Sequence, residues 1–245
     1  MPDLKSLKVK IFADGADLQG MKAMYANPLI KGFTTNPTLM RAAGVSDYVD
    51  FARKVLAAIP DRPVSFEVFA DDFEEMERQA IEIASWGPNV NVKIPVTNTK
   101  KEFCGPLVSR ISKRGVPVNV TAVFTLDQVR RLAEALAPDT PAIVSVFAGR
   151  IGDSGIDPVP VMREAARILK ARPKAELLWA SPRELLNVVQ ADDVGCHIIT
   201  CTNDILKKLP LLGKDQEAYS LETVKMFYND ACAANYAIRV PELAN

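Results

Sequence analysis

Short runs of β-branched and other apolar residues alternate along this chain with longer segments in which apolar residues recur at helical spacing. Eight such runs predict strands, at residues 9–14, 32–36, 64–70, 89–96, 117–124, 142–148, 175–181 and 196–202. Strands that alternate with helical segments are typical of a parallel sheet whose strands are joined by crossover helices. The pattern therefore predicts an α/β protein.

Two of the helical segments have the clearest pattern. Residues 71–86 place an apolar stripe opposite charged residues, with Phe73, Met76, Ala80, Ile83 and Ala84 in the stripe and Glu74, Glu75, Glu77 and Arg78 facing the other way. A second helix is expected after Asp127, which we predict to be its cap. Its apolar face consists of Val129, Leu132, Ala133 and Leu136.

Eight strand–helix units predict closure into a single (β/α)8 TIM barrel, with residues 1–245 forming one domain. An open doubly wound sheet of the same length is the alternative. Such a sheet often carries a glycine-rich phosphate loop after its first strand, and the segment Asp14-Gly15-Ala16-Asp17 is too poor in glycine to be one. The barrel is therefore favoured.

We predict that residues 215–240 form a helical extension beyond the eighth predicted strand. Its apolar residues on or near one face are Tyr219, Val224, Phe227, Tyr228 and Cys232. This helix either covers the outside of its own barrel or docks on a neighbouring subunit, and the sequence leaves both readings open. We expect the protein to be a homo-oligomer.

Composition narrows the class of partner. Thirty basic residues balance thirty acidic ones, so no net charge draws the chain to nucleic acid or to a membrane surface, and we expect a small-molecule substrate. The four cysteines are too scattered for a zinc site or a disulfide framework. No apolar run approaches the length of a membrane span. These features predict a cytoplasmic protein with reduced thiols.

Lys93 is predicted to point into the barrel. Side chains alternate between the two faces of a strand, so the residues of each predicted strand can be sorted by face. On the fourth predicted strand the helical layer takes Val90, Val92, Ile94 and Val96, which leaves Asn91, Lys93 and Pro95 pointing into the barrel. Most lysines are exposed because a buried ammonium is costly, but the apolar neighbours on both sides of Lys93 argue against exposure. A lysine removed from water is more often the neutral amine, which attacks carbonyl carbons.

The same sorting places polar residues on the inward faces of the other strands. The inward set is Asp14 on the first strand, Thr34 and Asn36, Ser65 and Glu67, Asn119 and Thr121, Ser145 with Phe147, and Trp179 with Ser181. Each has a structural explanation when taken singly, such as a helix cap at Asp14 or a turn before Pro37 at Asn36. Together they predict a polar ring around Lys93 at the C-terminal end of the barrel, where TIM-barrel active sites lie.

Four motifs, in order and with strand spacing between them, resemble those of a known family. They are Gly32-Phe33-Thr34-Thr35-Asn36-Pro37, Val92-Lys93-Ile94-Pro95-Val96-Thr97, Phe147-Ala148-Gly149-Arg150-Ile151 and Ala180-Ser181-Pro182-Arg183. The chain resembles the transaldolases from about residue 9 to about residue 206, in particular the short single-domain branch that also contains fructose-6-phosphate aldolase. Two positions depart from the family: Gly15 stands where a threonine often follows the aspartate, and the bulky Trp179 is expected in the pocket.

The resemblance implies a role for each member of the ring. Lys93 would form a Schiff base, Asp14 would be the acid/base residue, and Glu67 and Thr121 would shuttle protons through a water. The implied substrate-binding residues are Thr34, Asn36, Asn119, Ser145, Phe147, Arg150, Ser181 and Arg183, of which the two arginines and Ser181 would hold a terminal phosphate or similar anion. We expect no metal and no organic cofactor, because the imine supplies the polarisation.

Residues near the lysine separate the activities of this family. The chain is similar to transaldolases at Glu67 and Phe147, where the family's aldolases tend to carry glutamine and tyrosine. Without a tyrosine hydroxyl the enamine awaits an aldehyde, which favours moving a dihydroxyacetone unit from a ketose (phosphate) to an aldose (phosphate), as in the pentose phosphate pathway. Two alternatives remain: an aldolase that releases free dihydroxyacetone, and a catalytically silent barrel that only binds a sugar phosphate.

Overall fold

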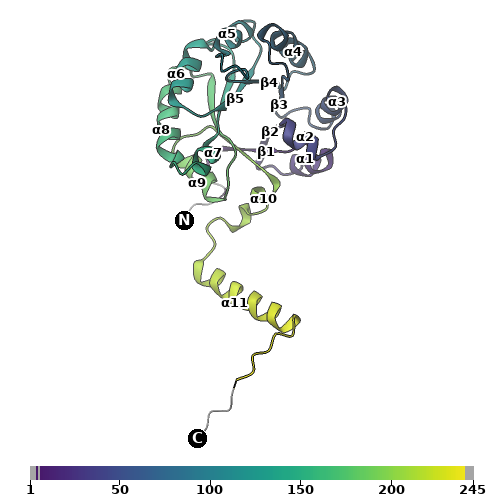
Figure 1. Cartoon of the computed structure of the whole chain (residues 1–245), viewed down its shortest axis with the longest axis vertical. Helices are drawn as coiled ribbons and strands as arrows, with labels where there is room; N and C mark the ends of the chain where they lie inside the picture. The colour runs from purple at the N-terminus through teal and green to yellow at the C-terminus, as the bar shows by residue number, and fades with distance from the viewer. Residues whose placement is uncertain (1–3, 5, 241–245) are drawn as a thin grey trace.

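The computed structural model describes residue 4 and residues 6–240, so the predicted domain limits at residues 1 and 245 lie outside the described residues. Eight parallel strands close into one barrel in chain order (Figure 1). The strands are β1 (Lys10–Asp14), β2 (Ile30–Thr34), β3 (Val64–Glu67), β4 (Val90–Pro95), β5 (Val118–Val123), β6 (Ala142–Val146), β7 (Ala175–Trp179) and β8 (Ile198–Cys201). The predicted (β/α)8 barrel is confirmed, and the open-sheet alternative is wrong.

Helices connect the strands and form the outer layer of the barrel (Figure 1). They are α1 (Leu18–Tyr25), α2 (Pro37–Ala42), α3 (Tyr48–Ala58), α4 (Phe73–Ser85), α5 (Gly105–Lys113), α6 (Leu126–Ala135), α7 (Ala148–Asp153), α8 (Pro158–Leu169) and α9 (Leu186–Asp193). After β8 the chain continues as α10 (Asn203–Leu206), the 3-10 helix η1 (Leu209–Leu211) and α11 (Gln216–Ala233). The short helices α2, α7 and α10 begin directly or soon after strands β2, β6 and β8, so their first turns lie at the C-terminal rim of the barrel.

The start of α6 differs from the sequence prediction. Thr125, not Asp127, is the N-cap, because its hydroxyl accepts a hydrogen bond from the Gln128 N–H while the Gln128 side chain accepts one from the Thr125 N–H. This reciprocal capping box satisfies two amide donors that the first helical turn leaves unpaired. Asp127 lies inside the first turn, where its negative charge still suits the helix N-terminus.

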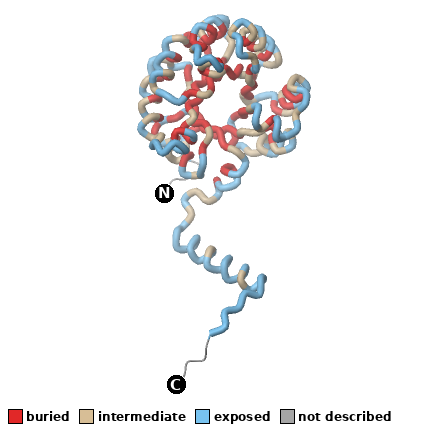
Figure 2. The backbone as a smooth tube through the Cα atoms, viewed as in Figure 1, coloured by how far each residue is buried: buried red, intermediate tan, exposed pale blue. Residues whose placement is uncertain are grey.

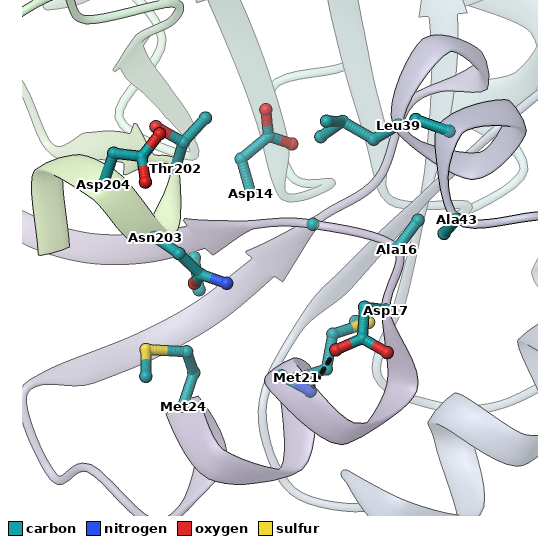
Figure 3. Close-up of a pocket in the computed structure, with 14 residues that line it drawn as sticks. Asp14, Ala16, Asp17, Met21, Met24, Leu39, Ala43, Thr202, Asn203 and Asp204 are labelled. Carbon is teal, nitrogen blue, oxygen red and sulfur yellow. Dashed lines mark hydrogen bonds between the residues drawn. The ribbon is translucent and has the colours of Figure 1, made fainter. Parts of the chain in front are cut away.

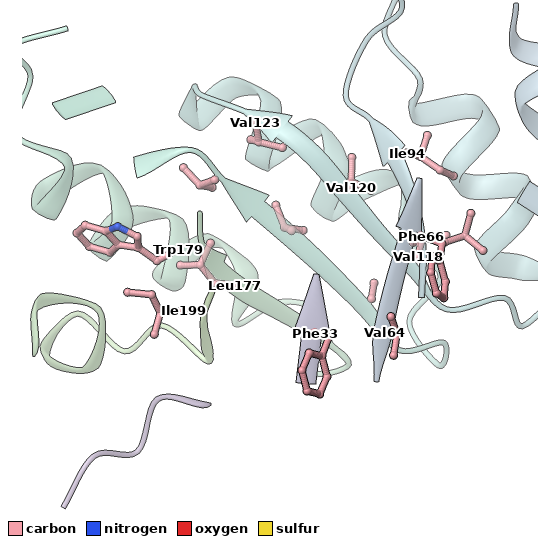
Figure 4. Close-up of a cluster of buried hydrophobic side chains, with 14 of the residues drawn as sticks. Phe33, Val64, Phe66, Ile94, Val118, Val120, Val123, Leu177, Trp179 and Ile199 are labelled. Atoms are coloured by element: carbon pink, nitrogen blue, oxygen red, sulfur yellow. The ribbon is translucent and has the colours of Figure 1, made fainter. Parts of the chain in front are cut away.

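The strands bury side chains on both of their faces. Outward-facing residues such as Phe33, Phe66 and Ile94 pack with the helices in one large cluster (Figure 4), and the buried residues follow the ring of strands (Figure 2). The barrel interior holds a smaller apolar cluster of Phe12, Ile143, Leu178, Ala180 and Ile198, with Phe147 packed against it. Gly32 makes room for this cluster, since a Cβ there would lie 2.5 Å from the Phe12 ring.

Trp179 corrects the face sorting on β7. It is fully buried in the outer cluster between sheet and helices (Figure 4), whereas Leu178 and Ala180 face the interior. The prediction assumed that the alternation of a strand continues through Ser181, but β7 ends at Trp179 and Ser181 has a left-handed φ of 55°. Because the turn breaks the alternation, Ser181 reaches the interior while Trp179 points outward, so no tryptophan stands in the pocket.

Helix α11 extends away from the barrel (Figures 1 and 2), and none of its residues is buried. The reading in which this helix covers its own barrel is therefore wrong. Among its exposed apolar side chains, Val224, Phe227 and Tyr228 are 60%, 63% and 70% exposed. In the described part of the chain, no helix combines the length and the apolar character that crossing a membrane requires.

Candidate active site

A cavity of about 80 Å³ lies inside the barrel at the C-terminal ends of the strands. Its lining contains Asp14, Thr34, Asn36, Lys93, Asn119, Thr121, Ser145, Phe147, Arg150, Leu178, Ala180, Ser181 and Thr200. Ten of these residues are candidates from the sequence, so the fold gathers them from six different strands or the segments that follow them. Of the remaining two candidates, Glu67 contacts Lys93 from beside the cavity and Arg183 points elsewhere.

Lys93 is buried, with 7% of the residue exposed, on the inward face of β4. The β3–β4 register sets Glu67 opposite Lys93, and the Lys93 Nζ lies 3.1 Å from the Glu67 Oε2. Lys93 Nζ also donates a hydrogen bond of 2.9 Å to the Thr35 carbonyl oxygen. The apolar surroundings inferred from the flanking residues therefore belong to the strand's other face, and the amine itself has a carboxylate and a carbonyl as neighbours.

Asp14 ends β1 and faces the same cavity. The Thr34 hydroxyl donates to its Oδ1 at 2.8 Å and the Asn36 amide donates to its Oδ2 at 3.4 Å. Burial raises the pKa of the Asp14 carboxyl above its ordinary value of 3.8, while the charge of Lys93 and the two hydrogen bonds act in the opposite direction. A carboxyl group whose pKa is raised in this way is suited to both giving and taking a proton.

Asn36 has a structural task as well as a place in the cavity. Its side-chain oxygen accepts a hydrogen bond of 2.9 Å from the Leu39 N–H and caps α2, while its amide nitrogen faces Asp14. Asn36 therefore has both of the roles that the sequence suggested, a structural one in the turn before Pro37 and one in the site. Because capping fixes the side chain, the amide donor is held in position beside the carboxylate.

A buried chain of hydrogen bonds crosses the opposite wall. Asn119 donates to the Ser65 Oγ at 3.0 Å, and the Ser145 hydroxyl donates to the Asn119 Oδ1 at 2.7 Å. The Thr121 hydroxyl is buried and has no hydrogen-bond partner among the described residues. Since a buried hydroxyl is costly to leave unpaired, Thr121 is the wall residue most in need of a water or substrate partner.

The two candidate arginines lie in different surroundings. Arg150 lines the cavity, with its guanidinium 5.2 Å from the Phe147 ring centroid. Arg183 instead pairs with Asp153, Nη2 to Oδ2 at 2.5 Å, and this hydrogen-bonded arginine holds the pKa of the Asp153 carboxyl below its ordinary value. Ser181 lines the cavity beside Arg150. The structure therefore brings Arg150 and Ser181 to the site and leaves Arg183 in an ion pair outside it.

Two residues of the site were missed from the sequence. The Thr200 hydroxyl lies 2.6 Å from the Thr34 hydroxyl, and face sorting of β8 would have found it, since Thr200 shares a face with Ile198. Tyr48, on α3, holds the end of β3: its hydroxyl accepts from the Glu67 N–H at 2.7 Å and donates to the Glu67 carbonyl at 3.0 Å. No sequence pattern points to Tyr48, because it reaches the strand from a helix outside the barrel.

Comparison with known proteins accords with this geometry. Residues 11–239 match the family model described as transaldolase/fructose-6-phosphate aldolase. A "Probable transaldolase" of Dehalococcoides mccartyi is 37% identical over 202 residues, covering 82% of this chain and 90% of the relative. Proteins of the same description from Methanococcus maripaludis strain C7 and Streptococcus agalactiae serotype V are 35% and 34% identical, covering 82% and 86% of this chain and 89% and 95% of the relatives.

Proposed function

Because this chain belongs to the transaldolase/fructose-6-phosphate aldolase family, we propose that it moves a dihydroxyacetone unit from a ketose phosphate to an aldose phosphate through a Schiff base on Lys93. The observation that carries the proposal is the contact of 3.1 Å between the buried Lys93 amine and the Glu67 carboxylate, beside the polar cavity. A lysine paired in this way has a proton acceptor within reach, which it needs before it can attack a carbonyl carbon.

Schiff-base formation requires protons to move near Lys93. In the proposed sequence the amine attacks the C2 carbonyl of the ketose, Glu67 takes the proton that the amine gives up, and the carbinolamine then loses water to give an iminium. The unpaired Thr121 hydroxyl holds the water through which these protons pass. The step needs no metal ion, because the iminium is itself the electron sink.

Carbon–carbon cleavage then falls to Asp14. Its carboxylate removes the proton of the C4 hydroxyl, the C3–C4 bond breaks, its electron pair enters the iminium, and an aldose leaves while the enamine stays bound. The raised pKa of Asp14 suits it to return that proton when a second aldose is attacked by the enamine. Asn36, Asn119 and Ser145, fixed by their hydrogen bonds, orient the hydroxyls of the three-carbon fragment.

We place the terminal phosphate of the substrate at the C-terminal rim of the barrel, after strands β6 and β7. Arg150 presents its guanidinium to the cavity next to Ser181, so these two residues hold the terminal phosphate. Arg183 joins them only if it leaves Asp153. Phe147 offers no hydroxyl to protonate the enamine, which supports transfer over release of free dihydroxyacetone. In this proposal the substrates are pentose phosphate sugars, or a modified sugar, in the cytoplasm.

Two measurements separate this proposal from its alternatives. Borohydride reduction in the presence of fructose 6-phosphate should add a dihydroxyacetone fragment or the intact sugar to the peptide that contains Lys93, and Lys93→Ala should fold normally and stay unlabelled. A wild-type enzyme without label on Lys93 would refute catalysis and leave a silent binding barrel. Turnover of the ketose should also require an added aldose, and substantial turnover without one would identify an aldolase.

We also propose a homo-oligomer in which α11 packs on a neighbouring copy. The support is the wholly exposed helix with Phe227 and Tyr228 in water, because an isolated helix of this length is marginally stable without packing. Light scattering on the full chain should give a multiple of 26.8 kDa, and Phe227→Glu should lower the mass of the assembly. A monomeric wild-type protein would contradict this part of the proposal.

A further inference from the structure

Asp14 is one end of a row of three hydrogen-bonded side chains from β1, β2 and β8. The Thr34 hydroxyl donates to the Asp14 Oδ1 at 2.8 Å and lies 2.6 Å from the Thr200 hydroxyl. Both threonines are buried, and both line the cavity that contains Lys93. No step of the proposed transfer uses Thr200, although its hydroxyl is connected to the acid/base carboxyl through a single residue.

The register of the barrel brings the three side chains together. Asp14 on β1 is paired with Thr34 on β2, and on the other side of β1 the partner of Phe12 is Thr200 on β8. Just before Phe12 the β1–β2 register shifts by one residue, so that Thr34 rather than Phe33 lies opposite Asp14. Because a shift of one residue exchanges the two faces of a strand, this irregularity sets a hydroxyl beside the carboxyl.

The directions of the two hydrogen bonds follow from the number of protons available. A hydroxyl has one proton, and an ionised carboxylate has none, so Thr34 donates its proton to Asp14 and Thr200 donates its own to Thr34. The other neighbours of Thr200 inside the barrel, Phe12 and Ile198, belong to the apolar interior cluster. Thr34 is therefore the one hydrogen-bond partner of the Thr200 hydroxyl within the described residues.

A protonated Asp14 needs a hydrogen-bond acceptor, and Asn36 cannot be that acceptor. The side-chain oxygen of Asn36 accepts the Leu39 N–H at 2.9 Å, so only its amide nitrogen, which is a donor, faces the carboxyl. Thr34 can be the acceptor, because a hydroxyl oxygen carries two lone pairs. The two partners of the carboxyl thus differ in kind, one fixed as a donor and the other reversible.

The far side of Asp14 supplies no other acceptor. There Asp14 borders a second cavity, of about 380 Å³, between α1, α2 and the segment after β8 (Figure 3). Asp17 and Asp204 also line this cavity, but in the described part of the chain neither is hydrogen-bonded to Asp14. The Asp17 carboxylate instead accepts the Gly20 N–H at 2.7 Å and caps α1.

Thr34 can accept from a protonated Asp14 only when its own proton points elsewhere. The contact of 2.6 Å permits this reversal, since either of the two hydroxyl oxygens can be the donor. Thr200 then accepts from Thr34 and directs its own proton into the cavity that it lines. Both hydroxyl groups rotate about their C–O bonds, and no covalent bond is made or broken.

We propose that Thr200 is a positioning residue for the acid/base step, which lets Thr34 donate to ionised Asp14 and accept from protonated Asp14. This proposal rests on the proposed transfer through Lys93. The second state is needed between the two half-reactions, because the first aldose has then left and its C4 proton stays on Asp14 until another aldose arrives. Thr200 thereby stabilises the acid for as long as the enamine waits.

Thr200→Val and Thr200→Ser are a matched pair, because valine keeps the shape of threonine without its hydroxyl and serine keeps the hydroxyl without the methyl group. With fructose 6-phosphate and erythrose 4-phosphate, Thr200→Val should lower kcat at least about tenfold, and Thr200→Ser should stay within about threefold of wild type. Borohydride trapping of dihydroxyacetone on Lys93 breaks no carbon–carbon bond, so both variants should trap within about twofold of the wild-type rate.

Equal kcat values for Thr200→Val and Thr200→Ser would overturn the proposal. A loss of trapping as large as the loss of transfer would also overturn it, since the whole cavity would then be disturbed. If Thr200→Val does not fold, Thr200→Cys, which has a weakly bonding thiol of similar size, should show the same difference between transfer and trapping. A wild-type protein without an adduct on Lys93 would refute the transfer itself, whereas an adduct without a difference between the variants refutes only the role of Thr200.

Discussion

Helix α7 offers a matched pair of substitutions, because its two glycines, Gly149 and Gly152, lie in very different surroundings. A Cβ on Gly149 would lie 1.5 Å from the carbonyl oxygen of Ser181 and 2.6 Å from its carbonyl carbon. A Cβ on Gly152 would meet nothing within 4 Å. The Gly149 N–H also donates to the Ala180 carbonyl at 3.2 Å, so this close approach joins α7 to the turn after β7.

The magnitude for Gly149→Ala follows from these distances. Real Cβ atoms essentially never come within 3.0 Å of another heavy atom, so α7 and the Ser181 backbone must separate by about 1.5 Å. Overpacking of this kind costs about 1–3 kcal/mol, and a chain of this size loses about 2–4 °C of Tm per kcal/mol, which gives a fall of about 2–12 °C. Gly152→Ala should instead gain up to about 1 kcal/mol, as alanine replaces a helical glycine.

The same displacement should reach the active site. Both Ser181, whose backbone the new methyl group would push, and Arg150, which follows Gly149 in the chain, line the cavity. Misplacement of a substrate-positioning group by about 1 Å can cost about 100-fold in rate. Thermal unfolding and transfer of dihydroxyacetone to an aldose phosphate, measured on both variants, test the reasoning. A Gly149→Ala protein as stable and active as Gly152→Ala would refute it.

Three further predictions concern single groups. Burial raises the pKa of the Asp14 carboxyl, so the folded protein holds the carboxyl proton more tightly than the unfolded chain and loses stability as the pH rises above 3.8 toward the raised pKa. Asp14→Asn should therefore raise Tm at about pH 7, while it abolishes transfer because the acid/base group is gone. A lower Tm would contradict this reasoning. Tyr48→Phe should lower the free energy of unfolding, measured in urea, by about 1–3 kcal/mol, because the Glu67 backbone loses both hydrogen bonds to the Tyr48 hydroxyl. The displaced Glu67 should also slow borohydride trapping on Lys93 and shift the pH profile of trapping. An unchanged profile would limit Tyr48 to a structural role. Burial raises the pKa of three thiols, those of Cys104, Cys196 and Cys201, to about 12, so an aromatic disulfide reagent should leave all three unlabelled in the folded protein. Fast labelling of any of them would be inconsistent with the structure.

Face sorting predicted most of the site because a strand's alternation is a local property. Lys93, Asn119 and Thr121 each follow from which neighbours are apolar, and the barrel then brings their strands together. The same method gave the wrong face for Trp179, where a left-handed residue after the strand reverses the count. A period of two residues cannot report where a strand stops, because strand ends depend on pairing with neighbours.

The sequence by itself determined the eight-unit barrel, the inward direction of Lys93 and the family, since periodicity and short motifs are carried by residues close together in the chain. Only the tertiary structure decided the partners of those residues. In the folded chain Lys93 pairs with Glu67, Arg183 forms an ion pair with Asp153 outside the cavity, and no residue of α11 is buried. These outcomes depend on distances between segments far apart in sequence, which are fixed when the strands close and the helices pack, and no local pattern encodes them.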